Sequence, residues 1–524
     1  MALSVRFARA SLRRAVTSSS RAMSIPLDAQ YFRADEMINE LRESQTKRFA
    51  ADDVLAEAIR VDEEWRNAIF AAEQGRKQQR ELAKRIGLLM RQKGDSEARA
   101  EAEALKGEVA ELKTRTADLQ KTASELENHR IHLMRQCGNI VHDSVPVSQD
   151  ESDNEETHLY SLGRDLEHER QQALALEKLG DSERHQSAYA CRFHHHEVLH
   201  MLGGADLEAG AAVAGHRGYY LTGKAAALNM ALQQYATHFL VTRGYSPVLP
   251  PLWMRREVMA QTAQLSQFEE ELFQLHPDSH QHEEEEMHSR FLIATSEQPL
   301  SAMHRSQRLQ RDTLPLRYAG VSPCFRKEAG AHGRDAWGIF RVHQFDKVES
   351  FVLCAPEESW QHHEEMMRNA QDFYETLELP YRVVNLVSGE LNNAAAKKLD
   401  LEAWFPARGE YRELVSCSNC TDYQSRMLDV RIEGETGEYV HMLNSTLCAT
   451  TRTICALLEN HQCHQENGVK IPKPLRPFLA PLLGVSPDAP EAALLTFERE
   501  PPRNKNADKM RRAASKKKQA REQH

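Results

Sequence analysis

The chain has 524 residues, of which 41% are hydrophobic and 27% charged, and its 67 Lys and Arg against 77 Asp and Glu give a net charge of −10. This length and composition indicate a globular protein of about two to four domains and argue against a wholesale cationic nucleic-acid binder. No run approaches about 18 consecutive apolar residues, which excludes a membrane span, and nine scattered cysteines favour free thiols in a reducing compartment.

The first 22 residues are rich in Arg and Ser and contain no acid. This composition predicts an organelle transit peptide, and a basic tail is the alternative. Met23 follows at once, so translation that begins there would give a cytosolic form. We therefore expect a cytoplasmic protein with an additional mitochondrial form.

Residues 27–145 contain no proline and are rich in strong helix formers. An apolar stripe between Leu55 and Leu89 and a later heptad seam predict an antiparallel two-helix hairpin, with a turn at residues 92–96 and Ser96 as the N-cap. The second helix, residues 96–136, would be about 60 Å long. Such an arm could reach a large charged partner or serve in dimerisation. The seam positions are Ala98, Ala102, Leu105, Val109, Leu112, Thr116, Leu119, Ala123, Leu126, Arg130 and Leu133.

After the arm, residues 143–157 hold six acids and little apolar content, which predicts a linker. From residue 191 mixed patterns predict an α+β body, with a helix at 221–234, an extended segment at 245–252 and a strand at 291–293. The last 22 residues carry nine Lys or Arg against two acids and predict a disordered basic tail. The expected division is 1–22 extension, 23–142 helical arm, 143–190 acidic linker and lead-in helix, 191–480 α+β body and 481–524 tail.

Residues 324–349 read as a hairpin suited to a nucleotide. Glycines at its turn, Gly330, Gly333 and Gly338, let backbone approach a ligand closely. Arginine favours multi-donor contact with phosphate, and Phe345 offers a flat face to a base. A charged surface hairpin without a ligand is the alternative. The cations are Arg326, Lys327, Arg334, Arg341 and Lys347.

Three patterns suggest metal sites only weakly. Residues 196–200 match H-E-x-x-H, but no third ligand accompanies them and the helix ends almost at once. Cys417 and Cys420 form a lone C-x-x-C, which favours structural thiols, so we expect no structural zinc. The His- and Glu-rich residues 276–288 favour a solvated acidic loop. Neither a P-loop nor G-x-G-x-x-G is present, so a nucleotide site needs another scaffold.

Five separated segments together resemble the seryl-tRNA synthetases, class II aminoacyl-tRNA ligases, of the eukaryotic cytosolic type. They are the helical arm, Thr-Ser-Glu at 295–297, the 324–349 hairpin (motif 2), ELVSCSNCTDYQSRM at 413–427, and LNST followed by TTRTICALLE at 443–459 (motif 3). The resemblance covers nearly the whole chain. It implies a mainly antiparallel β-sheet flanked by helices and a homodimer whose interface includes residues 221–251 (motif 1).

The resemblance implies activation of L-serine by ATP with Mg²⁺ and transfer to tRNA(Ser), and to tRNA(Sec) where present. Arg326 and Arg452 would be catalytic, at the α-phosphate and γ-phosphate respectively. Glu413 and Ser416 would hold Mg²⁺. A catalytically silent RNA-binding module is the alternative. The implied ATP contacts are Arg326, Lys327, Glu328, Val342, His343, Gln344, Phe345, Glu413, Leu414, Val415, Ser416 and Arg452.

For serine, the resemblance implies Glu349 at the hydroxyl, Thr295 and Glu297 at the ammonium group, and Asn444 closing the pocket beside Arg326. Discrimination by a buried polar group rejects analogues that lack the hydroxyl. Motif 3 reads Asn-Ser-Thr here and not the Asn-Gly-Ser of many bacterial members. Internal salt bridges, or a helix cap in the case of Asn444, are the alternative roles of these residues.

The resemblance also assigns the arm to the long variable arm of tRNA(Ser), with phosphate contacts that weaken as salt rises. A solvated helix face is the alternative at each position. The candidate contacts are Arg80, Lys84, Arg91, Lys93, Lys106, Lys113 and Arg115.

Overall fold

The computed structural model describes residues 24–92, 95–177, 193–262, 271–275, 289–328, 337–434, 437–463 and 465–501. Several predictions from the sequence lie outside these ranges: the 1–22 extension, the 276–288 loop, the last 22 residues, and Lys93, Gly330, Gly333 and Arg334. Within the described ranges, no helix combines the length and apolar character that crossing a membrane requires.

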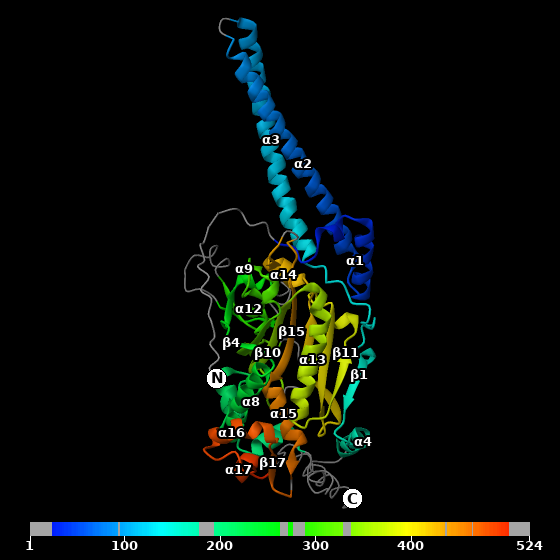
Figure 1. Cartoon of the computed structure of the whole chain (residues 1–524), viewed down its shortest axis with the longest axis vertical. Helices are drawn as coiled ribbons and strands as arrows, with labels where there is room; N and C mark the ends of the chain where they lie inside the picture. Colours follow the sequence, from blue (N-terminus) through cyan, green and yellow to red (C-terminus); the bar gives the residue numbers. More distant parts are fainter. Residues whose placement is uncertain are drawn as a thin grey trace, which may run out of the picture.

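The predicted helical hairpin is confirmed as a long arm that projects from the body (Figure 1). It consists of α2 (Asp52–Leu89) and α3 (Ser96–Met134), and all eleven seam positions of α3 are buried or half-buried. The N-cap is Asp95 and not Ser96. The Asp95 carboxylate accepts hydrogen bonds from the backbone N–H groups of Glu97 and Ala98 at 2.9 and 3.1 Å, so the cap stands one residue earlier than predicted.

Midway along the arm the two helices approach closely at Gly75. A Cβ atom on Gly75 would lie 2.4 Å from Oγ1 of Thr116, so no larger residue fits without a shift. Gln79 donates to the same Oγ1 at 2.8 Å, and the Thr116 hydroxyl donates to the carbonyl of Leu112 at 2.7 Å. The heptad seam therefore contains a polar layer at Thr116, and this layer is hydrogen-bonded.

The root of the arm is fixed by one buried carboxylate. Asp62 has no exposed surface and pairs with Arg33, Arg66 and Arg130 at 2.9, 3.0 and 2.7 Å. The guanidinium of Arg130 also lies 3.9 Å from the centre of the Trp65 ring. A buried charge that lost these partners would cost several kcal/mol, so the cluster ties α2 and α3 to the segment that carries Arg33.

Hydrogen bonds join the root to two loops of the body. Arg48, which follows α1 (Asp35–Lys47), donates to the carbonyls of Asn392 and Ala395 at 3.2 and 2.5 Å. Asn139 donates to the carbonyl of Cys420 at 2.9 Å, and Tyr423 donates to the carbonyl of Cys137 at the same distance. These hydrogen bonds therefore fix the position of the root of the arm on the body.

An eight-stranded sheet forms the centre of the body, in the order β1-β11-β12-β13-β15-β10-β9-β4. Its neighbours pair antiparallel, except that β4 runs parallel to β9. Helices α8, α13 and α15 cover one face, and their buried side chains join those of the strands in the largest core cluster (Figure 1). On the opposite face, Phe351 and Leu353 of β10 pack in a smaller core cluster with Leu300 and Leu428.

The bounds of these central elements follow. The strands are β1 (Glu155–Tyr160), β4 (Ser246–Val248), β9 (Leu316–Phe325), β10 (Gln344–Cys354), β11 (Tyr381–Asn385), β12 (Lys397–Phe405), β13 (Glu410–Asn419) and β15 (His441–Ala449). The helices are α8 (Gly223–Val241), α13 (Ser359–Thr376) and α15 (Thr450–Asn460). The predicted helix at 221–234 is thus longer, and β4 lies within the predicted extended segment.

Shorter elements complete the chain. The helices are η1 (Ala29–Phe32), η2 (Glu151–Asp153), α4 (Leu166–Glu177), α6 (His195–Met201), α7 (Leu207–Ala214), α9 (Arg256–Met259), α12 (Glu297–Ala302), η3 (Arg311–Thr313), η5 (Pro356–Glu358), η6 (Ser388–Glu390), α14 (Tyr423–Leu428), η7 (Lys473–Leu475), α16 (Arg476–Leu483) and α17 (Pro490–Ala493). The strands are β2 (Ala205–Asp206), β3 (Tyr220–Leu221), β5 (Trp253–Arg255), β6 (Gln274–Leu275), β7 (Arg290–Leu292), β8 (Arg308–Leu309), β14 (Arg431–Ile432), β16 (Gln462–Cys463), β17 (Gly468–Lys470) and β18 (Leu494–Thr496). The strand predicted at 291–293 is β7, one residue earlier.

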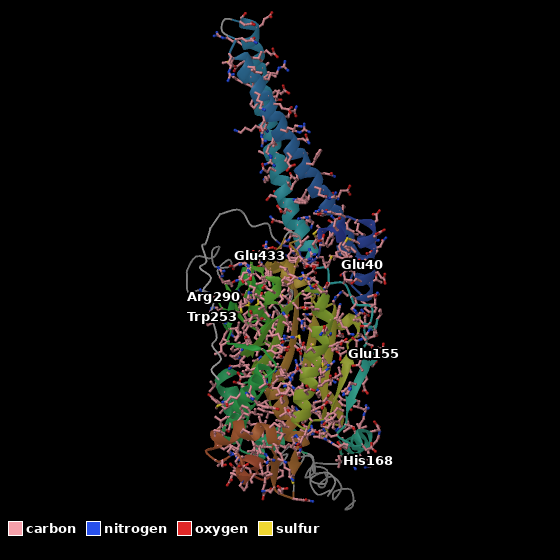
Figure 2. The ribbon with its side chains drawn as sticks, viewed as in Figure 1. Glu40, Glu155, His168, Trp253, Arg290 and Glu433 are labelled. Carbon is pink, nitrogen blue, oxygen red and sulfur yellow. The ribbon has the colours of Figure 1, made fainter. Side chains whose placement is uncertain are left out.

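The segments predicted as an acidic linker and a basic tail each overlap a strand at one end. The last residues of the expected acidic linker, from Glu155, form β1, which pairs with β11 at the edge of the sheet; Figure 2 shows Glu155 there. Its exposed acids suit an edge, because charge discourages further strand pairing. The expected tail is also ordered at its start, since Leu495 is 1% exposed and β18 pairs with β17.

Candidate active site

The predicted hairpin is confirmed where the structure describes it. Strands β9 and β10 pair so that Phe345 lies opposite Cys324 and Glu349 opposite Gly320. Phe345, Lys347 and Glu349 alternate with the other residues of β10, which places them on one face of the sheet. Arg326 follows β9, and its N–H donates to the carbonyl of His343 at 2.9 Å. The hairpin therefore presents an aromatic ring, a cation and an acid in a row.

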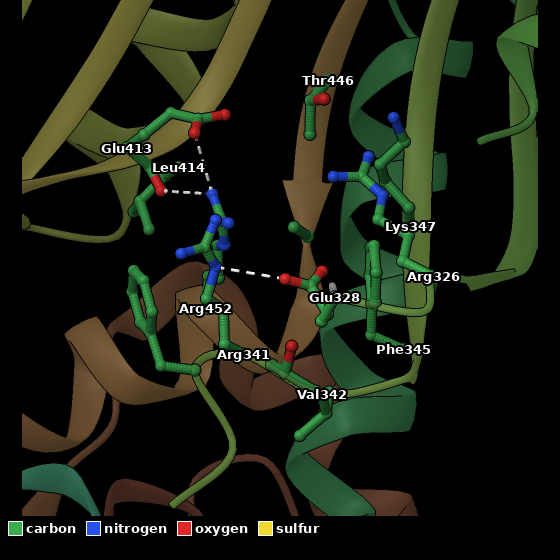
Figure 3. Close-up of a pocket in the computed structure, with 13 residues that line it drawn as sticks. Arg326, Glu328, Arg341, Val342, Phe345, Lys347, Glu413, Leu414, Thr446 and Arg452 are labelled. Carbon is green, nitrogen blue, oxygen red and sulfur yellow. Dashed lines mark hydrogen bonds and ion pairs between the residues drawn. The ribbon is translucent and has the colours of Figure 1, made fainter. Parts of the chain in front are cut away.

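A pocket opens beside Phe345 and Lys347 of this row (Figure 3). Seven of the predicted ATP contacts line it: Arg326, Glu328, Val342, Phe345, Glu413, Leu414 and Arg452. Lys327, His343, Gln344, Val415 and Ser416 are not among the lining residues. Six further lining residues had no assigned ATP contact: Phe340, Arg341, Lys347, Thr446, Ala449 and Thr451. All six lie within the motif 2 or motif 3 segments, and Arg341 and Lys347 were noted as cations of the hairpin. The fold brings them together where α15, β15 and the end of the hairpin loop meet.

One wall of the pocket is an acid–base pair. Arg452 donates to the Glu413 carbonyl at 3.0 Å and lies 3.1 Å from its carboxylate Oε2, as the dashed lines in Figure 3 show. Burial acts to raise the pKa of Glu413, but the guanidinium of Arg452 outweighs it, and the pKa is lowered. The Arg452 guanidinium also lies 5.0 Å from the centre of the Phe340 ring. Glu413 is therefore an anion, and Arg452 is a cation whose position is fixed by its contacts with Glu413.

The opposite wall carries Glu328, which has the left-handed backbone angle φ of 50°. Its Oε2 lies 3.2 Å from Nε of Arg341 and 3.7 Å from Nη1 of Arg217. Two arginines thus fix the orientation of the Glu328 carboxylate. Glu328 itself has a backbone geometry that residues other than glycine rarely adopt.

Arg326 stands between the pocket and the Thr-Ser-Glu segment. Its guanidinium lies 5.4 Å from the centre of the Phe345 ring, and its Nε donates to the carbonyl of Ala294 at 3.4 Å. Because Ala294 directly precedes Thr295, Arg326 borders both the nucleotide pocket and the expected serine site.

The predicted serine-binding residues form a connected cluster next to Arg326. Glu349 is 1% exposed, pairs with Lys347, and accepts from the Thr295 hydroxyl at 3.5 Å. Thr295 in turn accepts from the N–H of Glu297 at 3.3 Å. Lys347 thus gives the buried Glu349 carboxylate a charged partner, which burial of such a group requires.

Glu297 and Asn444 close the far end of this cluster. Gln424 donates to Glu297 Oε1 at 2.8 Å, while burial and the nearby Glu349 raise the pKa of Glu297. Asn444 lies within β15 and contacts Sγ of Cys420 at 3.6 Å. The cap of α15 is Ala449, so the interpretation of Asn444 as a helix cap is wrong.

Ser416 is not among the residues that line the pocket, and its partner across the strands is a residue that was not predicted from the sequence. Ser416 stands opposite Asp400 in the β12–β13 pairing. Asp400 is 8% exposed, and its Oδ1 has no hydrogen-bond partner among the described residues. Burial and Glu413 raise its pKa. Only the strand register could have revealed this carboxylate, since the two residues are 16 positions apart.

The patterns that resembled zinc sites have structural partners. Glu197 accepts from the N–H of His194 at 2.8 Å in a capping box at the start of α6. Cys417 and Cys420 are buried and unbridged, and burial raises the pKa of both thiols, which disfavours the thiolate form that binds metal. Among the described ranges, no group of three or more His, Cys, Asp or Glu side chains is arranged to hold a metal.

An antiparallel sheet with a nucleotide pocket between a cationic hairpin and an arginine-bearing helix defines a class II aminoacyl-tRNA synthetase. Residues 280–461 match the family model "tRNA synthetase class II core domain (G, H, P, S and T)", and residues 27–141 match "Seryl-tRNA synthetase N-terminal domain". The chain belongs to the seryl-tRNA synthetase family, the serine–tRNA ligases. The predicted α+β class II fold and ligase activity are thereby confirmed.

Relatives from distant eukaryotes agree in length with this chain. It is 44% identical to the cytoplasmic serine–tRNA ligase of Schizosaccharomyces pombe, covering 92% of this chain and 99% of that one. It is 41% identical to the human cytoplasmic serine–tRNA ligase, and the match covers 95% of this chain and 97% of that one.

Two solved structures share the architecture. The cytoplasmic serine–tRNA ligase of Naegleria fowleri in complex with AMP superposes with a TM-score of 0.71 at 38% identity, covering 88% of this chain and 96% of that one. The seryl-tRNA synthetase of Pyrococcus horikoshii complexed with ATP superposes with a TM-score of 0.74 at 38% identity, covering 86% of this chain and 98% of that one.

Proposed function

We propose that this chain joins L-serine to the α-phosphate of ATP, forming seryl-adenylate, and transfers the seryl group to tRNA(Ser), and to tRNA(Sec) where a cell has one. The observation that carries the proposal is the position of Arg326, which borders both the nucleotide pocket and the Thr295–Glu349 cluster. Two ligands that must react with each other would meet at that side chain. The ATP and AMP complexes of the two solved relatives support the same use of the pocket.

Adenylate formation is an in-line displacement, so positioning and neutralisation of charge matter more than a proton-transferring base. Arg326 binds the α-phosphate and the serine carboxylate, and Arg452 binds the γ-phosphate end. Glu328 accepts from the adenine amino group, and Phe345 covers the adenine face. Lys327 and Val342, His343 and Gln344 complete the surrounding wall, and Leu414 and Val415 supply backbone beside Glu413.

Glu413 and Ser416 would hold Mg²⁺ with ATP. Their donor atoms fit a hard cation, since both are oxygens and the adjacent Asp400 has an unpartnered buried oxygen among the described residues. When bound, the ion supplies positive charge to the phosphate oxygens. Without it, Glu413 is compensated by Arg452.

Serine selection rests on Glu349, which accepts a hydrogen bond from the substrate hydroxyl. Thr295 and Glu297 receive the ammonium group, and Asn444 closes the pocket. Because the Glu349 carboxylate is buried, an amino acid without a hydroxyl leaves it with one partner fewer, which disfavours alanine.

The arm reads the long variable arm of tRNA(Ser). The six described candidates are all exposed on α2 and α3 or directly after α2: Arg80, Lys84, Arg91, Lys106, Lys113 and Arg115. The helical arm 23–142 and the catalytic domain 191–480 would then be separate working parts, with the acidic segment 143–190 between them.

The decisive measurement is serine-dependent exchange of pyrophosphate into ATP. We expect exchange in the wild type and a loss of at least about 3 kcal/mol of transition-state stabilisation in Arg326→Ala. Arg308→Ala, on an exposed side chain paired with Asp429, is the control and should leave exchange unchanged. Intact tRNA binding without any exchange would favour the alternative, a silent RNA-binding module.

We also propose a homodimer through α8 and β4. Large apolar side chains are exposed on and after these elements: Met230 is 47% exposed, Val241 42%, Leu249 84% and Trp253 50% (Figure 2 labels Trp253). An exposed apolar surface of this kind is typical of a subunit interface.

Sedimentation should give a particle of twice 59.7 kDa for the wild type. Leu249→Asp should shift the chain towards the monomer, whereas Leu159→Asp, on the opposite edge of the sheet and 50% exposed, should not. Dimerisation that survives Leu249→Asp would exclude this edge as the interface.

The relatives named cytoplasmic support a cytoplasmic location. A second, mitochondrial form rests on the composition of residues 1–22 alone. Fusion of residues 1–30 to a fluorescent reporter tests it, and purely diffuse fluorescence would refute it.

A further inference from the structure

A buried ion pair next to the nucleotide pocket has no part in the mechanism above. His195, the first residue of α6, is 3% exposed, and Glu459, near the end of α15, is fully buried. The ring Nδ1 lies 2.9 Å from Oε1 of Glu459, which also accepts from the backbone N–H of His195 at 3.0 Å. The other carboxylate oxygen accepts from the N–H of Ala407 at 3.3 Å. Glu459 thus has several donors around it and stays ionised.

The partners of the ring decide its protonation. Nδ1 faces the Glu459 carboxylate and Nε2 faces the carbonyl of Trp337 at 3.2 Å, and both partners are acceptors. A neutral imidazole has one N–H and would turn a lone pair towards one of these oxygens, whereas an imidazolium donates to both. Burial acts to lower the pKa of His195, but Cys455 and Glu459 raise it to about 10. His194 and His196 flank it on its own element.

The ring supports the chain where it returns to the nucleotide pocket. Gly338 packs so closely that a Cβ atom would lie 2.7 Å from Nε2 of His195, and its φ of +67° suits glycine. Phe340, Arg341 and Val342, which follow, line the pocket. The same ring contacts α15, which carries Arg452, so it connects two walls of the pocket.

We propose that His195 is a positioning residue for ATP: as an imidazolium that donates to Glu459 and Trp337, it holds residues 337–342 against α15 so that the Phe340 ring meets the Arg452 guanidinium. This inference rests on the proposed function for the identity of the nucleotide. The serine cluster has no hydrogen bond to this pair among the described residues and should be unaffected.

Kinetics of His195→Gln test the role. Pyrophosphate exchange should show a KM for ATP raised about tenfold, as expected for the loss of a charge-assisted hydrogen bond, with the KM for serine changed less than about twofold. His363→Gln is the matched control, because His363 is equally buried but makes one hydrogen bond, to the carbonyl of Cys417 at 3.1 Å, which glutamine can replace. Equal rises in both KM values, or lower thermal stability without any change in KM, would overturn the proposal.

Nitrogen-15 NMR of the wild type gives an independent measurement. At pH 8 the signals of His195 should show both ring nitrogens protonated, and a neutral ring would overturn the proposal. If His195→Gln does not fold, Gly338→Ala displaces the same segment from the ring and should also raise the KM for ATP. Calorimetric measurement of ATP binding separates the role of His195 from the proposed function. If the wild type performs no pyrophosphate exchange but His195→Gln still binds ATP more weakly than the wild type, the proposed function is refuted and the role of His195 stands.

Discussion

At the scale of single residues, the proposed role of Glu349 would let a buried carboxylate make the amino-acid site selective. Lys347 pairs with this carboxylate, and the serine hydroxyl would add a further hydrogen bond to the same acceptor. Arg326, Lys347 and Glu413 place two cations and one anion around the same pocket, beside the Phe345 ring.

Glu349→Gln should narrow the preference for serine over alanine by about 10- to 100-fold, because a neutral amide forms a weaker hydrogen bond with the hydroxyl. Pyrophosphate exchange with each amino acid gives the ratio. The KM for ATP is the internal control and should stay within about twofold. An unchanged ratio would assign the hydroxyl to another residue.

Sequence alone identified the residues whose chemistry is rare. Arg326, Phe345, Glu413 and Arg452 stand in motifs, and all four line one pocket. Phe340 and Thr446 stand within the same motifs but had no assigned contact, and Asp400 was not found. The position of Asp400 beside Ser416 depends on strand register, and register between residues 16 positions apart leaves no local pattern.

At the scale of elements, the proposed function makes the arm a tRNA-binding part that can be separated from the catalytic body. Since α2 and α3 nearly touch at Gly75 and Thr116, residues 76–115 can be replaced by a short glycine turn, which leaves the Asp62 cluster intact. This removes all seven candidate tRNA contacts at once.

For this shortened chain we expect unchanged pyrophosphate exchange, weaker tRNA binding and slower tRNA charging. The slope of log K against log salt should also become shallower by about 0.7 to 0.9 for each phosphate that the arm no longer binds. Filter binding at several salt concentrations measures the slope. An unaltered slope would mean that these residues form only a solvated face.

Elements were predictable where their pattern is long. The heptad seam continues for eleven positions and defines α3 almost to its ends. Strands β1 and β18 were missed because each is short, and each depends on a partner distant in sequence or on one buried side chain, Leu495. Acidic residues at a sheet edge look like a linker until the partner strand is known.

At the scale of the whole molecule, the His195–Glu459 pair makes stability depend on pH. The folded-state pKa of about 10 lies above the ordinary 6.5, so this stabilisation is complete below pH 6.5, declines above it and is lost near pH 10. The difference in Tm between the wild type and His195→Gln should therefore shrink as pH rises from 6.5 to 10. Thermal unfolding at four pH values measures it, and a constant difference would contradict an imidazolium.

The attachment of the long arm at its root also has a geometric consequence. Helix α2 has 38 residues, so the arm acts as a lever about 57 Å long, and a rotation of one degree at its root moves its tip by about 1 Å. The ion pairs of Asp62 with its three arginines hold α2, α3 and the segment of Arg33 together at that root. Under the proposed function, Asp62 would therefore limit how far an RNA bound to the arm moves relative to the pocket.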